Sequence, residues 1–259
     1  MTAPGRTRRA AAQNAPADRL ALGRVPMILM YHAVADIPWD PNQLGVTPAR
    51  FAQQMDTLHR LGLRGVGIGT LVDAMRAGRQ RGLVGITFDD GYVSVLEAAV
   101  PELLRHGFTG TFFVISGRLG GTNDWDEGTP WPLVSPSQVR ELASAGMEIG
   151  AHGATHIRLA GLDGGQLHAE IGGSRARLGE LTGAPVRGFA YPYGSMDAAA
   201  RRAVRQAGYD YACAVASPLA GLGPMALPRI YAGQRDGPAR LAAKRLAYRA
   251  YIAAKGRHA

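Results

Sequence analysis

The stretch Leu83-Val-Gly-Ile-Thr-Phe-Asp-Asp-Gly91 decides the fold class of this chain. Its first six residues are mostly apolar and uncharged, which is typical of a strand buried in a parallel sheet. Two carboxylates and a glycine follow directly after that run. Because sites in α/β proteins assemble at the carboxyl ends of parallel strands, we expect a strand over 83–88 and a functional site immediately after it.

Apolar runs of similar length recur along the chain and alternate with helical patterns. Thr47 and Pro48 resemble an N-cap and a first helical residue, which places the start of one helix. Further strands are expected over 27–31, 111–115, 147–151, 186–190, 209–215 and 227–231. Helical segments are expected over 48–62, from 91 to 106, and over 137–145 and 167–181. Strands that alternate with helices imply parallel βαβ units, either in an open doubly wound sheet or in a barrel.

The charge of the chain is concentrated at its two ends. The 259 residues carry a formal charge of +9, with five Arg and one Asp in 1–24 and seven Lys or Arg and one Asp in 234–259. The stretch 25–233 is therefore nearly neutral, and its apolar content is sufficient for one large core. We expect a disordered basic arm over 1–24, one folded domain over 25–233, and a basic, helical C-terminal tail over 234–259.

Composition also narrows the classes of partner. Basic residues in two tails, rather than on a folded face, argue against a nucleic-acid binder. The single cysteine, Cys213, lies in an apolar run and excludes an internal disulfide. No transmembrane segment and no secretory signal are visible, so a cytoplasmic protein is expected. The basic and apolar residues of the tail leave peripheral membrane contact open as an alternative.

Three polar groups directly follow predicted strands, namely Asp89-Asp90, the His152/His156 pair and Tyr193. Two imidazoles four residues apart can face one divalent metal, and Asp90 would supply the carboxylate that completes the set. Asp89 would then stay free to accept a proton. Each group alone is also typical of a turn, a helix N-cap or a structural histidine. Their joint position after strands favours a single metal site.

These groups resemble the motifs of a known family. Thr87-Phe-Asp-Asp-Gly91, the His152/His156 pair and Phe189-Ala-Tyr-Pro-Tyr-Gly194 are similar to the first three motifs of the polysaccharide deacetylase family, carbohydrate esterase family four. The flanking segments Pro26-Met-Ile-Leu-Met-Tyr-His-Ala-Val34 and Leu227-Pro-Arg-Ile230 resemble a branch that begins with a Tyr-His-x-Val strand. The resemblance spans roughly 25–232.

The family resemblance implies a fold, an activity and roles for individual residues. It implies a distorted (β/α) barrel of about seven parallel strands that removes acetyl groups from N- or O-acetylated saccharides. Asp90, His152 and His156 would hold a divalent metal ion, most commonly Zn²⁺. Asp89 would be the general base, and the backbone N–H of Tyr193 would help to bind the oxyanion.

The sequence departs from the family pattern at three places. Gly153 replaces a Ser or Thr that follows the first histidine, and Ala190 replaces the Arg that orients the base. The late Leu-x-His motif, whose histidine protonates the leaving group, is not visible. We expect Arg229 to take over from the missing Arg and His32 to supply the missing imidazole.

The sequence says less about the residues that bind the substrate than about those that bind the metal. Tyr92, Pro192 and Trp131 are expected to contact an acetylated polymer, oligomer or carrier-linked sugar, since aromatic rings can stack on sugars. Two alternatives remain. One is a metal-dependent amidohydrolase acting on a non-sugar amide or cyclic imide. The other is a catalytically silent carbohydrate-binding relative.

Overall fold

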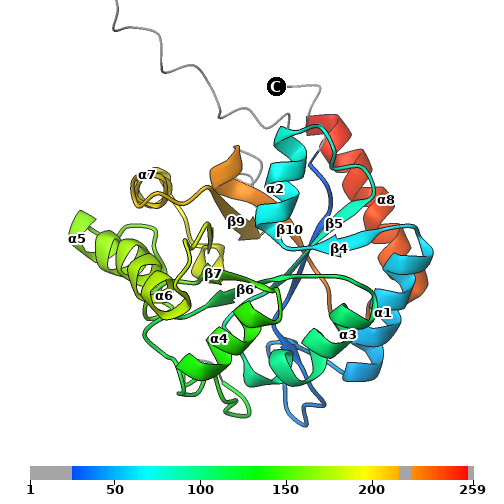
Figure 1. Cartoon of the computed structure of the whole chain (residues 1–259), viewed down its shortest axis with the longest axis horizontal. Helices are drawn as coiled ribbons and strands as arrows, with labels where there is room; N and C mark the ends of the chain where they lie inside the picture. Colours follow the sequence, from blue (N-terminus) through cyan, green and yellow to red (C-terminus); the bar gives the residue numbers. More distant parts are fainter. Residues whose placement is uncertain (1–24, 126, 216–222, 256–259) are drawn as a thin grey trace, which may run out of the picture.

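Seven parallel strands close into a barrel, as the family resemblance predicts (Figure 1). The computed structural model describes residues 25–125, 127–215 and 223–255. The ring closes because β1 pairs with β10 on one side and with β5 on the other. In order around the ring, the strands are β1 (Ile28–Tyr31), β10 (Leu227–Tyr231), β9 (Tyr211–Val215), β8 (Gly188–Ala190), β7 (Glu148–Ala151), β6 (Thr111–Val114) and β5 (Leu83–Phe88).

The ring is irregular at two points. The described residues give β7 and β8 one register pair, Ala151 with Phe189. The extra strand β4 (Arg64–Val66) pairs with the first half of β5, on the same edge that β6 uses further along. Two short strands, β2 (Ala33–Val34) and β3 (Gly45–Val46), form a separate parallel pair beside the barrel.

Helices pack around the outside of the ring (Figure 1). Thr47 caps α1 by accepting a hydrogen bond from the Arg50 N–H, as the Thr-Pro signal predicts. The helical elements are α1 (Pro48–Arg60), α2 (Ile68–Arg76), the π-helical η2 (Val95–Ala99), α3 (Val100–Arg105), α4 (Pro136–Ser144), α5 (Gly164–Leu167), the π-helical η3 (His168–Gly173), α6 (Ser174–Thr182), the 3₁₀ turn η4 (Pro192–Gly194), α7 (Ala198–Gln206), the 3₁₀ turn η5 (Pro224–Ala226) and α8 (Pro238–Lys255).

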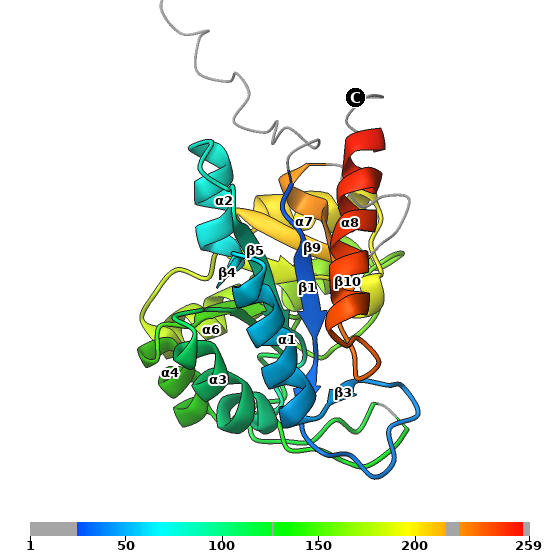
Figure 2. The same cartoon turned by 90° about the vertical axis from the view of Figure 1, so that its right-hand side faces the viewer.

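The basic C-terminal segment forms α8, which lies against α1 and the start of β1 (Figure 2). Leu241 and Tyr248 of this helix are buried in the main core, and the Tyr248 hydroxyl donates to the Pro26 carbonyl at 3.2 Å. Much of the segment over 234–259 is thus part of the outer layer of the barrel. The proposed arm over 1–24 lies outside the described residues. Among the helices described, none combines the length and apolarity needed to span a bilayer.

Candidate active site

The turn after β5 places two neighbouring carboxylates at the same end of the barrel. Asp90 has φ of 70° and Gly91 has φ of 82°, and the Gly91 N–H donates to the Asp89 carbonyl at 2.9 Å. Glycine adopts this left-handed conformation readily, whereas it costs an aspartate about 1–3 kcal/mol. The bend lets Asp89 and Asp90, both only 3% exposed, face the same cavity.

Asp90, His152 and His156 form a metal-type cluster. Asp90 Oδ1 lies 3.4 Å from His152 Nε2 and 3.3 Å from His156 Nε2, and the three ligand atoms lie within 4.8 Å of one another. The Asp90 Oδ1 atom is buried and has no hydrogen-bond partner among the described residues. Nδ1 of His152 lies 2.8 Å from the Ala190 carbonyl, which can fix the tautomer that turns Nε2 toward the cluster. These donors fit a divalent cation with open positions for water and substrate.

Arg229 of β10 faces Asp89, which follows β5, with β1 lying between these two strands in the ring. Its guanidinium donates to both carboxylate oxygens, at 2.6 and 2.7 Å, and to the Thr87 hydroxyl at 3.2 Å. Arg229 is 2% exposed, so this is a buried two-point ion pair. The structure therefore brings to Asp89 the arginine that the sequence suggested as a substitute for the residue missing at Ala190.

The site carboxylates are held in their charged form. Burial opposes the charge of Asp89, but the neighbouring Arg229 outweighs it and keeps the Asp89 pKa below its usual value. Burial also opposes the charge of Asp90, whose pKa is nonetheless held well below the usual range by the His152 and His156 imidazoles beside it. Conversely, the two carboxylates raise the pKa of His152 against the effect of burial.

Glu170 supports the loop that carries the two histidines, a role that the sequence did not reveal. Its buried carboxylate accepts from the backbone N–H groups of Ala154 and Thr155, at 2.9 and 3.0 Å, and from the Thr155 hydroxyl at 2.5 Å. Gly153 has φ of 80°, and a Cβ there would lie 3.0 Å from a Glu170 oxygen. The Glu170 carboxylate thus steadies this loop in the place of the hydroxyl that Gly153 lacks.

Two aromatic rings contact the His156 imidazole. Its centroid lies 4.7 Å from that of Trp125 and 4.6 Å from that of Tyr193. The Tyr193 ring also contacts Arg158, whose guanidinium lies 4.6 Å from its centroid. His156 and Tyr193 both have left-handed φ, 65° and 55°. Contacts with both rings therefore hold a strained metal-type histidine.

A cavity of about 390 Å³ opens over these groups. His32, at the end of β1, lines it together with Asp89, Asp90 and Tyr193, and His32 Nδ1 is buried without a hydrogen-bond partner among the described residues. The volume is within the usual range for a small-molecule site. The structure therefore gathers at one cavity all seven residues expected for catalysis and metal binding, listed here in chain order: His32, Asp89, Asp90, His152, His156, Tyr193 and Arg229.

The three residues expected to bind substrate do not lie in the wall of this cavity. Tyr92 is completely buried beside Leu133, and Trp131 packs edge-on against it at 5.1 Å. Pro192 is buried in the turn before Tyr193. The chain turns toward the core directly after the Asp pair, which separates Tyr92 from the site. Trp125 is the tryptophan of the long loop that reaches the histidines.

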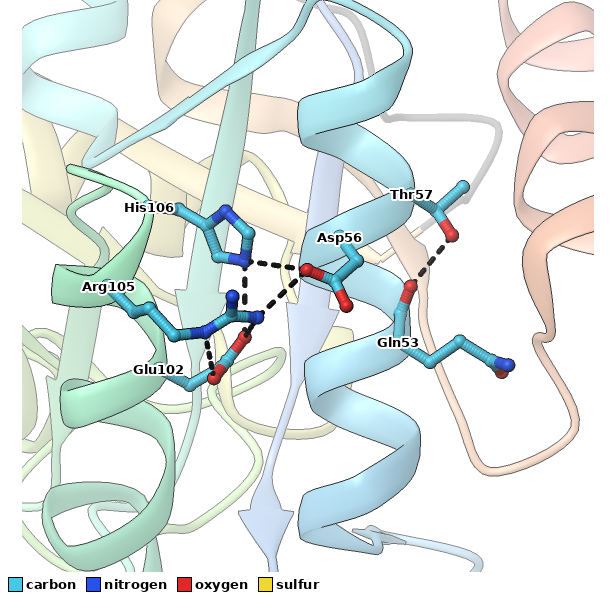
Figure 3. Close-up of polar contacts among 6 residues, drawn as sticks. All are labelled: Gln53, Asp56, Thr57, Glu102, Arg105 and His106. Carbon is cyan, nitrogen blue, oxygen red and sulfur yellow. Dashed lines mark hydrogen bonds and ion pairs between the residues drawn. The ribbon is translucent and has the colours of Figure 1, made fainter.

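A second cluster of metal-type side chains lies on the outer helices α1 and α3 (Figure 3). His106 Nε2 lies 3.2 Å from both Asp56 Oδ1 and Glu102 Oε1. Arg105 donates to the same two oxygens, at 2.8 and 2.6 Å. Because the guanidinium already supplies the positive charge there, we assign this cluster to an ion-pair network that joins the two helices.

Comparison with known proteins adds independent information. A family model described as polysaccharide deacetylase matches residues 76–212. The chain is 27% identical over 185 residues to "Putative polysaccharide deacetylase YxkH" of Bacillus subtilis (strain 168), across 71% of this chain and 62% of that protein. The chain thus spans less than two thirds of that relative.

Solved structures share the fold. The Streptococcus pyogenes deacetylase PplD in complex with acetate matches with a TM-score of 0.72 at 21% identity, over 84% of this chain and 96% of that one. IcaB from Ammonifex degensii matches with a TM-score of 0.69 at 27% identity, over 85% and 96%. Since the family model covers more than half of the sequence, this chain belongs to the polysaccharide deacetylase family.

Proposed function

We propose that this protein is a metal-dependent hydrolase that removes acetyl groups from an N- or O-acetylated saccharide. The observation that carries the proposal is the buried Asp89–Arg229 pair beside the cluster of Asp90, His152 and His156. One carboxylate is held by a guanidinium while its neighbour faces two imidazoles. This separation provides a base and a metal ligand from adjacent residues.

Asp90, His152 and His156 would hold the metal, which we expect to be Zn²⁺ because two imidazoles and one carboxylate suit that ion. A bound divalent metal supplies Lewis-acid chemistry, lowering the pKa of water and polarising the acetyl carbonyl. The buried Asp90 Oδ1, without a hydrogen-bond partner among the described residues, supports this assignment.

The remaining steps fall to groups of the chain. Asp89 accepts the proton of the attacking water, and Arg229 keeps Asp89 ionised and oriented until then. The backbone N–H of Tyr193 binds the charge that develops on the carbonyl oxygen. His32 donates a proton to the departing nitrogen or oxygen, which agrees with its place in the cavity wall.

The case for a non-sugar amide or cyclic imide as the substrate began with the arginine missing at position 190. Arg229 supplies a guanidinium to Asp89 from another strand, so the absence of arginine at position 190 no longer favours a different reaction. The carbohydrate-binding alternative requires a broken site, whereas the base and all three metal-type ligands lie at one cavity. Saccharide deacetylation is therefore the function that the geometry supports best.

An acetate-release screen tests the proposal. Metal-loaded protein is incubated with amino-sugar oligomers, acetylated polysaccharides and nucleotide-linked amino sugars, and acetate is measured by a coupled assay. We expect acetate and a new amine or hydroxyl in equal amounts. His32→Ala should lower kcat by about 10²–10⁴-fold on N-acetyl substrates, and less on O-acetyl ones, whose leaving group needs less acid assistance. His168→Ala, on an exposed histidine of η3, is the control. Ring-opened product or ammonia from a cyclic imide or non-sugar amide in the same screen, without acetate from any saccharide, would instead establish the amide alternative.

A further inference from the structure

A groove of about 1060 Å³ lies at the end of the barrel opposite the active site. His32, Asp89 and His152 follow the ends of β1, β5 and β7, whereas the groove is lined by Met27, which precedes β1, and by Leu83, which begins β5. Its other wall is the last turns of α8. Figure 2 shows this end of α8 beside the start of β1, far from β3.

The groove combines an apolar floor with a basic rim. Leu63, Leu83 and Tyr248 are among its apolar residues, and Leu246 at its edge is 70% exposed. Three arginines also line it, namely Arg81, Arg245 and Arg249, and its lining includes no Asp or Glu. The described residues provide no ion-pair partner for these three guanidinium groups. The surface is therefore positive around an apolar hollow.

The two ends of the described chain meet at this groove. Val25 and Ala253 both line it. The sequence that precedes Val25 carries five Arg and one Asp, and the last four residues include Arg257. The basic ends of the chain thus join the barrel at the same face as the three arginines.

We propose that this face docks the protein on an anionic membrane surface, with an acyl chain in the groove and lipid phosphates on Arg81, Arg245 and Arg249. Charge complementarity favours an anionic partner, and the apolar floor favours a lipid over a wholly polar polyanion. The active site then points away from the bilayer. On the proposed function, the saccharide reaches the enzyme from the aqueous side.

Vesicle co-sedimentation of the full chain tests this docking without any substrate. Vesicles of phosphatidylglycerol mixed with phosphatidylcholine are compared with pure phosphatidylcholine at about 0.1 M and about 1 M salt, where screening differs strongly. We expect binding to the anionic vesicles alone, and its loss at high salt. Removing one arginine should weaken binding about fivefold, so the double variant Arg245→Gln/Arg249→Gln should lose about 25-fold.

Matched variants separate this face from the rest of the surface. Leu246→Asp should weaken binding, whereas Leu104→Asp and Arg202→Gln, exposed on α3 and α7, should bind as the wild type does. Thermal melts check that each variant is folded. Equal binding to both kinds of vesicle, or unchanged binding of the double variant, would overturn the proposal. A third result would also overturn it: the protein binds duplex DNA and no vesicles, and the same substitutions abolish the binding to DNA.

Discussion

Replacing Arg229 by alanine should lower both the stability and the activity of the protein. The substitution leaves Asp89, 3% exposed, without the two hydrogen bonds of 2.6 and 2.7 Å that balance its charge. Breaking one side of a buried ion pair costs about 3–5 kcal/mol in the free energy of unfolding. For a domain of this size, the melting temperature should fall by about 6–20 °C.

Thermal melts and acetate release measure the two effects on the same preparations. Arg187→Ala is the matched control, because Arg187 makes equally short contacts with Asp73 and Asp210 but is about one-third exposed. Its ion pairs should contribute at most about 1 kcal/mol. Restoring apolar packing with Asp89→Leu/Arg229→Met should recover most of the stability of Arg229→Ala while leaving the enzyme inactive. If Arg229→Ala melts and turns over like the Arg187→Ala control, the assigned role of Arg229 is wrong.

Three further results are expected. Glu170→Ala should weaken metal binding by about 10–100-fold in a chelator competition, because the loop before His156 loses three hydrogen bonds; an unchanged affinity would remove Glu170 from the site. Trp125→Ala should weaken metal binding in the same assay and Trp125→Phe should restore it, since a flat ring against His156 is what matters; equal losses in both variants would contradict this. The free energy of unfolding should fall above about pH 10, because burial raises the pKa of several tyrosines in the folded state and the unfolded chain therefore loses these protons first. A urea midpoint that stays constant from pH 9 to about 11 would refute this. These tyrosines are Tyr31, Tyr191, Tyr209, Tyr211 and Tyr248.

Strands of the barrel could be predicted from short runs of largely apolar residues. The expected strands over 83–88 and 227–231 match β5 and β10 residue for residue. No comparable signal marked α7, whose turns are mostly Ala and Arg and bury only Ala200 and Val204. β4 was also missed, because it has three residues, one of them Gly65, and pairs outside the ring.

Residues of the candidate site could be predicted from the sequence where they lie close together in it. Asp89-Asp90 and the two histidines form local motifs, and Arg229 was suggested by a motif although 140 residues separate it from Asp89. Glu170 acts on the histidine loop through the fold of η3, and no local spacing marks it. Trp125 approaches the histidines and Trp131 does not, because of the way the long loop folds back toward Tyr92. Residues that act across the fold in this way need the structure.

The most direct test of the central claim is metal content and acetate release measured together on Asp89→Asn. Asp89 is assigned as the base and Asp90, His152 and His156 as the ligands, so this variant should bind the same amount of metal as the wild type. Its acetate release should fall by at least about 10²-fold. Wild-type turnover by a folded, metal-loaded Asp89→Asn protein would contradict the account.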